Sequence, residues 1–333
     1  MAAINLSFLN RNPRYVLLVL FVLVLSTFLL LPGPFHPSYD SLPDFHDYLP
    51  SKFRNGMGGM ALEDFVRREE LRYAEVLRGR KELIRQNGPE PKKVESFPGG
   101  SIFYTLWDFF IPAFNCPHRV DRLGALGDGG KWICGVDRLA MKHDPCVVYS
   151  FGVNHDSSFE AAFLTRAPNC QIWGYDFSVS SWGPEITENP ALAPLCHFNA
   201  YALGAEDKPH DSPPTYTIDT LMKMNGHKFI DILKIDIEGG EFETLAQFVE
   251  PYLRPDGPGL PIGQLEIEIH AWANNGDFEK FLTWWENLER GGLRPFWTEP
   301  NIIYVSHLRT RPDLAEYSFI NVKERHALIA DGY

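Results

Sequence analysis

Short apolar segments with the pattern of buried strands alternate with helical segments through most of residues 146–290. This alternation predicts a parallel sheet with helices on both of its faces. The predicted strands are 146–152, 170–177, 197–204, 231–239 and 264–270, and the predicted helices are 157–167, 216–224, 240–253 and 277–292.

The segments on either side of this alternation have different patterns. Residues 101–116 are rich in aromatic side chains and are expected to be helical, and 131–135 is expected to form a short strand after a glycine-rich loop. Two final strand-like segments, 295–306 and 317–323, have only a loop between them. We therefore expect them to form an antiparallel hairpin at one edge of the sheet.

An apolar run covers residues 15–31, where seventeen consecutive residues carry no charge. This is close to the shortest helix that crosses a bilayer. Arg11 and Arg14 precede the run, so the positive-inside rule predicts a type II anchor with a cytoplasmic tail at 1–14 and a lumenal remainder. A short anchor suits the thin membranes of the endoplasmic reticulum or Golgi. A cleaved signal peptide is the alternative, although its apolar region would be shorter and would end in small residues.

Residues 32–96 are predicted to form a stem and linker. Prolines and glycines recur too often in its first part for regular structure to persist. Residues 61–86 are instead rich in helix formers, and Asn87-Gly88-Pro89 ends the predicted helix. Its heptad-like apolar spacing is interrupted, so we expect a solvated helix that leans on the next domain, with a short coiled coil as the alternative. The globular domain is predicted over 97–333.

Net charge and cysteine content exclude some classes of protein. The chain has 31 basic and 43 acidic residues and a formal net charge of −12, which argues against a nucleic-acid partner. Its five cysteines include no pair with CxxC spacing, so a thiolate zinc site is not expected. Cys146 and Cys170 each begin a predicted strand. Two buried free thiols are the default expectation, and a disulfide between neighbouring strands is the alternative.

The first candidate site is the turn after the strand 146–152. Gly152 ends this strand, and its missing Cβ would let a ligand approach the backbone. Ser157 and Glu160 have the spacing of a capping box, which predicts that the next helix starts there. The free N–H groups of that helix would then face an anionic group such as a carboxylate or a phosphate. An ordinary strand–helix turn is the alternative.

The second candidate site is Asp176, at the tip of the second predicted strand. An acid about 20 residues beyond a glycine turn of this kind is the usual acceptor for ribose hydroxyls in α/β sheets. A surface aspartate that caps a loop would have the same sequence pattern. Its pairing with the Gly152 turn is what favours a nucleoside site.

The third candidate site combines charged residues that recur two apart in the neighbouring strands 231–239 and 264–270. Residues two apart share one face of a strand. The charged residues are Lys234, Asp236 and Glu238 on the first strand and Glu266, Glu268 and His270 on the second. Buried charges need partners, so we predict that those nearest the strand ends line a cleft. These are Asp236, Glu238, Glu268 and His270. The alternative is that the second strand has one face in solvent.

Residues 127–245 carry three ordered motifs that match one family. The motifs are DGGKWIC at 128–134, SFGVNHDSSFE at 150–160 and ILKIDIEG at 232–239. In these motifs the chain resembles the class I S-adenosylmethionine (SAM) methyltransferases, and most nearly their FkbM-like group and the membrane-anchored methyltransferase-like proteins. The resemblance implies an α/β fold with a Rossmann-like, doubly wound sheet of seven strands, and SAM at the tips of the first two central strands.

The resemblance also implies which residues bind the cofactor. Gly152 and Asn154 match a glycine–asparagine turn around SAM, and Asp176 matches the acid that binds its ribose. The predicted cofactor site comprises Gly152, Asn154, Asp156, Ser157, Asp176 and Phe177. Two positions depart from the family pattern, because Ser150 replaces the usual acid of the first motif and Asp156 stands where glycine is frequent.

The predicted reaction is methyl transfer to a hydroxyl of a glycan, a lipid or a small molecule. The methyl group of a sulfonium is already activated, so the protein mainly aligns the acceptor with it. The acceptor also loses a proton, and His270 is the predicted base. Asp236 is predicted to position the acceptor or the cofactor, and Glu268 or Glu238 to orient the imidazole. No metal is expected, although Asp236, Glu238 and His270 would suit a divalent cation as an alternative.

Two other functions fit an anchored α/β domain. A lumenal glycosyltransferase would have the same anchor, and Asp236-Ile237-Glu238 imitates its metal-binding acidic pair. The glycine pair 239–240 and the capped turn at 152–160 argue against that function. The other is a catalytically inactive methyltransferase fold that binds a partner, an alternative that the departures at Ser150 and Asp156 leave open.

Overall fold

The structure is a computed structural model that describes residues 61–333. The predicted cytoplasmic tail 1–14, the predicted membrane anchor 15–31 and the first part of the stem lie outside these residues. Within the described range, no helix has both the length and the apolar character that crossing a bilayer requires. The anchor therefore stays a prediction from sequence.

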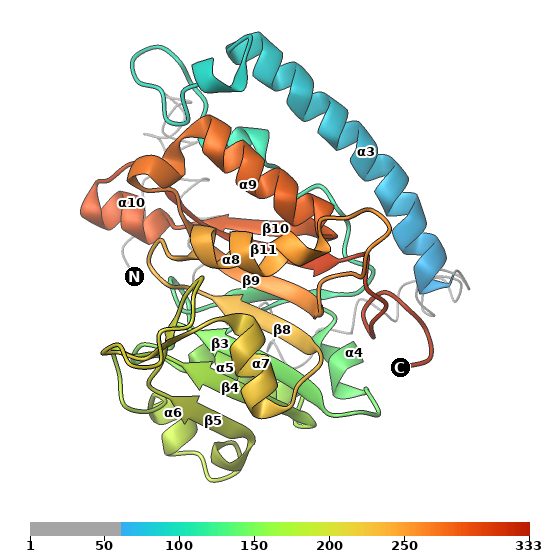
Figure 1. Ribbon diagram of the computed structural model, residues 1–333, viewed down its shortest axis with the longest axis vertical. Helices are drawn as coiled ribbons and strands as arrows, with labels where there is room; N and C mark the ends of the chain where they lie inside the picture. Colours follow the sequence, from blue (N-terminus) through green and yellow to red (C-terminus); the bar gives the residue numbers. More distant parts are fainter. Residues whose placement is uncertain (1–60) are drawn as a thin grey trace, which may run out of the picture. The chain divides into compact units, whose positions relative to one another are not determined.

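A seven-stranded sheet forms the centre of the domain (Figure 1). Across the sheet the strands are β10 (Leu293–Pro300), β11 (Leu314–Asn321), β9 (Ile262–His270), β8 (Ile230–Ile235), β3 (Cys146–Phe151), β4 (Cys170–Tyr175) and β5 (Cys196–Asn199). The five strands from β9 to β5 are parallel, and β11 is antiparallel to both of its neighbours. The predicted doubly wound, mostly parallel sheet with an antiparallel pair at one edge is confirmed.

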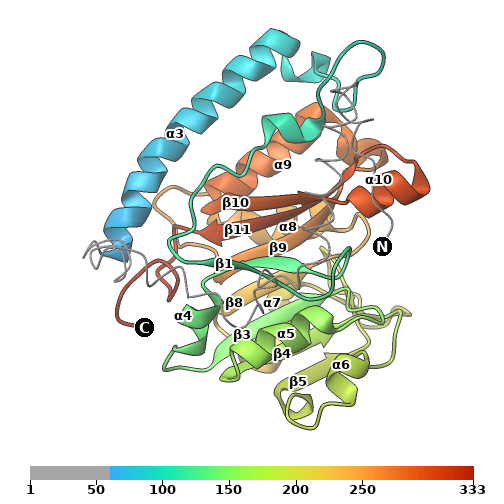
Figure 2. The ribbon, with the colours of Figure 1, turned by 180° about the vertical axis from the view of Figure 1, so that it is seen from behind.

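Helices cover both faces of this sheet. Three of them, α7 (Ile218–Asn225), α8 (Glu241–Val249) and α9 (Phe278–Arg290), lie over the face that Figure 1 shows in front. The helices α4 (Val136–Ala140) and α5 (Ser158–Arg166) lie over the face seen in Figure 2, with the small sheet of β1 (Val120–Leu123) and β2 (Lys131–Cys134). Shorter elements are η4 (Pro91–Lys93), η5 (Leu106–Phe109), α6 (Pro184–Thr187), η6 (Ala193–Leu195), β6 (Ala202–Leu203), β7 (Thr215–Tyr216), η7 (Glu250–Tyr252), η8 (Ala273–Gly276) and α10 (Ile302–Leu308).

Each face of the sheet has its own hydrophobic core because side chains alternate along a strand. In β3, Tyr149 and Phe151 pack under α7, α8 and α9. Cys146 and Val148 of the same strand pack on the other side, with α4 and α5. This two-sided burial explains why the central strands have nearly continuous apolar sequences.

Three expectations about individual segments were wrong. The strand predicted over 295–306 ends at Pro300, and the helix α10 follows it where we expected the rest of that strand and the start of a loop. The side chain of Asn301 caps this helix by accepting a hydrogen bond from the Tyr304 N–H at 2.9 Å. Residues 101–116 contain only the short turn η5 instead of a longer helix. The segment 197–204 is divided between β5 in the main sheet and β6, which pairs with β7 in a separate sheet.

The predicted helix over 61–86 is present as α3 (Leu62–Asn87) and packs against the domain. The guanidinium group of Arg80 donates to both carboxylate oxygens of Glu289 on α9, at 2.9 and 2.6 Å. Tyr73 donates its hydroxyl to the same carboxylate at 2.6 Å. All three side chains are buried, so α3 is tied to the domain by polar contacts shielded from water.

Two disulfides join elements of this domain. Cys146 and Cys170 start β3 and β4, are paired in register and are bridged, with their Cα atoms 4.4 Å apart. Cys116 and Cys134 form a second bridge that the sequence did not suggest. The structure therefore contains the disulfide between Cys146 and Cys170 that we gave as the alternative, and not two free thiols. Cys196 is a free thiol.

Candidate functional site

A cavity of about 410 Å³ opens at the carboxyl ends of β3, β4 and β8. The chain leaves β3 for β4 on one side and returns to β8 on the other, and ligands of doubly wound sheets bind at this kind of switch point. The volume lies in the range of small-molecule sites, about 300–1,000 Å³. The lining residues are Asp128, Phe151, Gly152, Asn154, Tyr175, Asp176, Phe177, Ser178, Tyr201, Ala202, Leu203, Asp236, Ile237, Glu238, Gly240 and Glu268.

Gly152 forms one wall of this cavity in a left-handed conformation, with φ of 74°. A Cβ atom at this position would lie 1.8 Å from the carbonyl oxygen of Asp236, so only glycine fits. The requirement for glycine thus comes from the backbone at the tip of β8, and we had expected it to come from a ligand. The carbonyl oxygen of Gly152 accepts a hydrogen bond from Lys234 Nζ at 2.7 Å, which holds the turn in place.

Asp176 lies directly against this turn, as predicted. Its Oδ2 accepts a hydrogen bond from the Asn154 N–H at 2.7 Å, and its Oδ1 accepts from the N–H and the hydroxyl of Ser178, both at 2.7 Å. Burial would raise the pKa of Asp176, but the hydrogen bonds from Ser178 and Asn154 outweigh it and lower the pKa. The cavity wall therefore carries an ionised carboxylate beside the turn, suited to accept hydrogen bonds from a ribose diol.

Two of the predicted cofactor residues, Asp156 and Ser157, do not line the cavity. The helix α5 does begin after Ser157, but the capping box is wrong: Ser157 Oγ accepts from the Gly183 N–H, and Glu160 accepts from the Ser150 hydroxyl. Two N–H groups at the start of the helix bind protein carboxylates, since Ser157 N donates to Glu185 at 3.1 Å and Ser158 N donates to Asp156 at 2.8 Å. These groups are consequently not directed at a ligand.

Carboxylates line the opposite end of the cavity, where Asp128, Asp236, Glu238 and Glu268 meet. Glu316 on β11 is paired in register with Glu268 on β9, so the two side chains share one face of the sheet. Burial and the charges of Glu316 and Asp236 raise the pKa of Glu268 to about 8. Burial likewise raises the pKa of Glu316, to about 7, against the opposing effect of Lys131, which forms an ion pair with it.

His270 lies behind these carboxylates and is not among the residues that line the cavity. Its Nδ1 is 2.8 Å from Glu241 Oε1, and its Nε2 is 3.4 Å from Glu238 Oε2. Burial would lower the pKa of the imidazole, but its hydrogen bond with Glu241 and the charges of Glu241 and Glu268 raise the pKa to about 9. Every residue of β9 is buried, so the alternative of a strand with one face in solvent is wrong.

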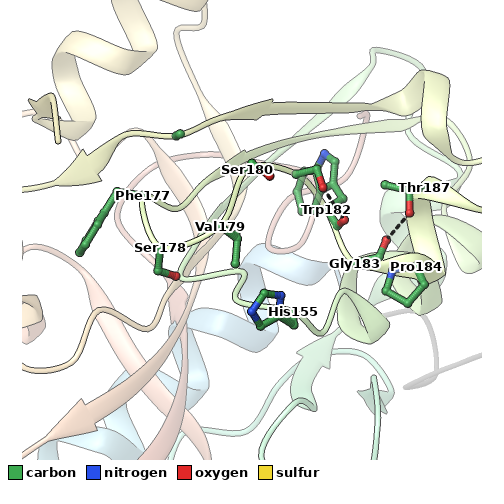
Figure 3. Close-up of a pocket in the computed structure, with 11 residues that line it drawn as sticks. His155, Phe177, Ser178, Val179, Ser180, Trp182, Gly183, Pro184 and Thr187 are labelled. Atoms are coloured by element: carbon green, nitrogen blue, oxygen red, sulfur yellow. Dashed lines mark hydrogen bonds between the residues drawn. The ribbon is translucent and has the colours of Figure 1, made fainter. Parts of the chain in front are cut away.

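A second, more open pocket of about 690 Å³ lies beside the first, over the loop that follows β4. Phe177 belongs to the linings of both pockets, and the residue is 59% exposed. Figure 3 shows its ring at one end of the pocket and Trp182, Gly183 and Pro184 at the other. The indole of Trp182 packs closely on Gly174 of β4, where a Cβ would be only 2.2 Å from the ring. Phe177 thus offers an exposed aromatic face next to the carboxylate of Asp176.

Several site residues were missed from the sequence. Asp128 belongs to the first motif, but nothing in the pattern showed that its loop folds over the strand tips. Tyr175 and Tyr201 line the cavity from the β4 end and from the loop after β5. Glu316 was missed because it comes one residue before the segment 317–323 that we predicted as the last strand. Glu316 and Ser318 are polar residues two apart on β11, and this alternation could have extended the predicted strand to include Glu316.

Residues 77–320 match the family described as methyltransferase domain, and the chain belongs to this family of class I SAM-dependent methyltransferases. The resemblance drawn from the three motifs is therefore confirmed. The cofactor of the family is S-adenosyl-L-methionine. The ionised Asp176 on the cavity wall, next to the turn at Gly152 and Asn154, fits the ribose of that cofactor.

Curated relatives include two proteins called probable methyltransferase-like protein 24. The human one is 28% identical over 170 residues, which are 47% of this chain and 43% of the relative. The one from Rattus norvegicus is 24% identical over 216 residues, which are 58% and 56% of the two chains. The chain thus matches about half the length of these relatives.

Solved structures that align with the chain include a Methanococcus jannaschii fibrillarin pre-rRNA processing protein. It has a TM-score of 0.35 and 13% identity, over 59% of this chain and 72% of the other. M. capricolum TrmK, solved with S-adenosyl-homocysteine, has a TM-score of 0.31 and 11% identity, over 57% of this chain and 68% of the other.

Proposed function

We propose that the protein is a membrane-anchored SAM-dependent methyltransferase that methylates a hydroxyl group of a glycan, a lipid or a small molecule. The observation that carries this proposal is the position of Asp176, whose ionised carboxylate lines the cavity and touches the backbone of Asn154 at 2.7 Å. In this arrangement Asp176 accepts hydrogen bonds from the ribose. The exposed ring of Phe177 lies beside it, where it would offer an aromatic face to the adenine.

Bound SAM would supply an activated methyl group, and the carboxylates at the other end of the cavity would then lie where an acceptor can bind. The protein aligns the acceptor oxygen with the methyl group, and this alignment is its main contribution to the rate. We assign the proton acceptor to Glu268, which lines the cavity. His270, the base expected from sequence, is 1% exposed and does not line the cavity, and its Nδ1 is engaged by Glu241. His270 is therefore better placed to orient the carboxylates of Glu238 and Glu268 than to contact the methyl acceptor.

The proposal places the catalytic domain in the lumen of the endoplasmic reticulum or Golgi. The apolar run 15–31 with arginines before it supports a type II anchor. The two disulfides also support a lumenal location of the domain, because disulfides persist in oxidising compartments and are rare in the cytosol.

Calorimetric titration of the full-length chain with SAM, and separately with uridine diphosphate sugars, tests the function. We expect SAM to bind and the nucleotide sugars not to bind. Asp176→Ala should weaken SAM binding at least about tenfold, because it removes a charged hydrogen-bond acceptor. The control is Asp144→Ala, on an exposed loop. Sugar nucleotide binding without SAM binding would instead indicate a glycosyltransferase, and binding of neither would indicate an inactive fold.

A further inference from the structure

Three side chains with metal-binding donor atoms converge at the carboxylate end of the cavity. Asp236 and Glu238 follow β8, His270 ends β9, and these two strands are adjacent and parallel. One donor atom from each residue lies within 4.8 Å of the other two. We propose that Asp236, Glu238 and His270 bind a first-row divalent cation such as Mn²⁺.

The orientation of the imidazole is the first support for this site. His270 Nδ1 is 2.8 Å from Glu241 Oε1, and Glu241 is fully buried on α8. Histidines that bind metals commonly donate their other ring N–H to a carboxylate, which fixes the tautomer and directs the free nitrogen at the ion. Here that contact leaves Nε2 facing Glu238 at 3.4 Å and Glu268 at 3.7 Å.

The burial of His270 is the second support. The residue is 99% buried, and the distances from its Nε2 to Glu238 Oε2 and Glu268 Oε2, 3.4 and 3.7 Å, are longer than a usual N–H···O hydrogen bond. At these distances the nitrogen either carries a proton that pairs with the carboxylates or leaves room for a cation among the three side chains. The second option also supplies the carboxylates with a counter-charge.

The balance of charge is the third support. Five carboxylates surround this end of the cavity, from Asp128, Asp236, Glu238, Glu268 and Glu316. Apart from His270, the ion pairs that the described part of the chain makes with them involve only Lys131, which contacts Glu316 and lies 3.9 Å from Asp236 Oδ2. Glu316 is about nine-tenths buried, and its Oε2 has no partner among the described residues. Ionising this many grouped carboxyl groups together requires more counter-charge than Lys131 supplies, and an ion of charge +2 would provide it.

The donor set indicates the kind of cation. Carboxylate oxygens suit Mg²⁺, Ca²⁺ and Mn²⁺, whereas imidazole suits first-row transition ions, and a site with both favours ions such as Mn²⁺. Three protein ligands leave open coordination positions. Because Asp236 and Glu238 line the cavity, an open position faces it. If the proposed function holds, the ion would bind the acceptor hydroxyl there and lower its pKa.

Titration of Mn²⁺ into the full-length chain, followed by calorimetry and by the electron paramagnetic resonance of the bound ion, tests this proposal. We expect one Mn²⁺ per chain. Glu238→Gln and His270→Gln should each weaken the binding more than tenfold. Glu241→Gln, which alters the orientation of the imidazole, should weaken it about 10- to 100-fold. Glu243→Gln is the matched control, because Glu243 lies on α8 with its side chain in solvent and should leave the affinity unchanged.

Absence of Mn²⁺ binding by the wild type would overturn the proposal, and so would equal affinity in the wild type and Glu238→Gln. The Glu238 variant remains informative if the buried His270→Gln variant does not fold, because the Glu238 side chain is 76% exposed. The titration contains no SAM, so a failure of methyl transfer leaves its result unaffected. Binding of SAM without Mn²⁺ would retain the proposed function and reject the metal site.

Discussion

At the scale of single residues, Glu268 is the side chain on which the proposed chemistry depends. It lines the cavity and accepts a hydrogen bond from Asn301 Nδ2 at 3.0 Å, a contact that glutamine can also make. Glu268→Gln should lower the rate of methyl transfer about 100-fold or more, because general bases contribute about 10²–10⁴-fold. SAM affinity should change less than twofold. Single-turnover assays with labelled SAM measure the rate, and an unchanged rate would reject Glu268 as the proton acceptor.

His326 is a residue whose titration affects stability far from the cavity. It is buried, its Nε2 lies 2.7 Å from the Asn321 carbonyl oxygen, and its Nδ1 accepts a hydrogen bond from the Leu328 N–H. Burial lowers the pKa of His326 to about 4. The unfolded chain, with an imidazole pKa of about 6.5, therefore binds more protons than the folded chain between these values.

The folded state should consequently lose stability as the pH falls from 6.5 to 4, by at most about 3 kcal/mol from this residue. His326→Gln removes the titration and retains one donor and one acceptor. The free energy of unfolding, measured at pH 7 and pH 4.5, should change less with pH in the variant than in the wild type. Equal pH dependence in the two proteins would show that His326 does not titrate as inferred.

At the scale of secondary-structure elements, the helix α3 is joined to α9 by the buried ion pair between Arg80 and Glu289, so we expect it to stabilise the domain. Removing Arg80 leaves the buried carboxylate of Glu289 without its counter-charge, which typically costs about 3–5 kcal/mol. Arg80→Met should therefore lower the free energy of unfolding by about 3 kcal/mol. Arg78→Met is the control on the same helix, since Arg78 is exposed and its pair with Glu75 lies in solvent.

Denaturant unfolding of both variants measures this difference. If Arg80→Met and Arg78→Met behave alike, the buried ion pair between α3 and α9 adds nothing to the stability of the domain. If Arg80→Met is destabilised as expected, a fragment that starts at residue 97 should unfold at a lower temperature than one that starts at residue 61. The border of the domain that we predicted from sequence is tested by the same comparison.

Whole-molecule features differ in how well the sequence predicts them. The sheet was predictable because buried parallel strands and amphipathic helices leave strong local patterns, and the motif around Gly152 placed Asp176 next to the turn. Which carboxylates meet at the end of the cavity could not be predicted from the sequence. Glu316 reaches Glu268 only because β11 inserts between β9 and β10, and Glu241 reaches His270 from a helix position 29 residues earlier. Both contacts depend on strand order and helix rotation, which local patterns do not encode.

The proposed orientation in the membrane can be tested by giving the chain a site for N-glycosylation. No N-x-S/T acceptor occurs after residue 31, so a lumenal domain should carry no N-glycan. Phe103→Asn would create the acceptor N-Y-T, and Phe103 is 93% exposed, so the change should leave the fold intact. In cells we expect this variant, but not Phe103→Gln, to migrate more slowly on gels and to return to the wild-type position after endoglycosidase treatment. An unmodified Phe103→Asn variant whose cysteines are all free thiols would place the domain outside the lumen, because N-glycans are added there and disulfides form in oxidising compartments.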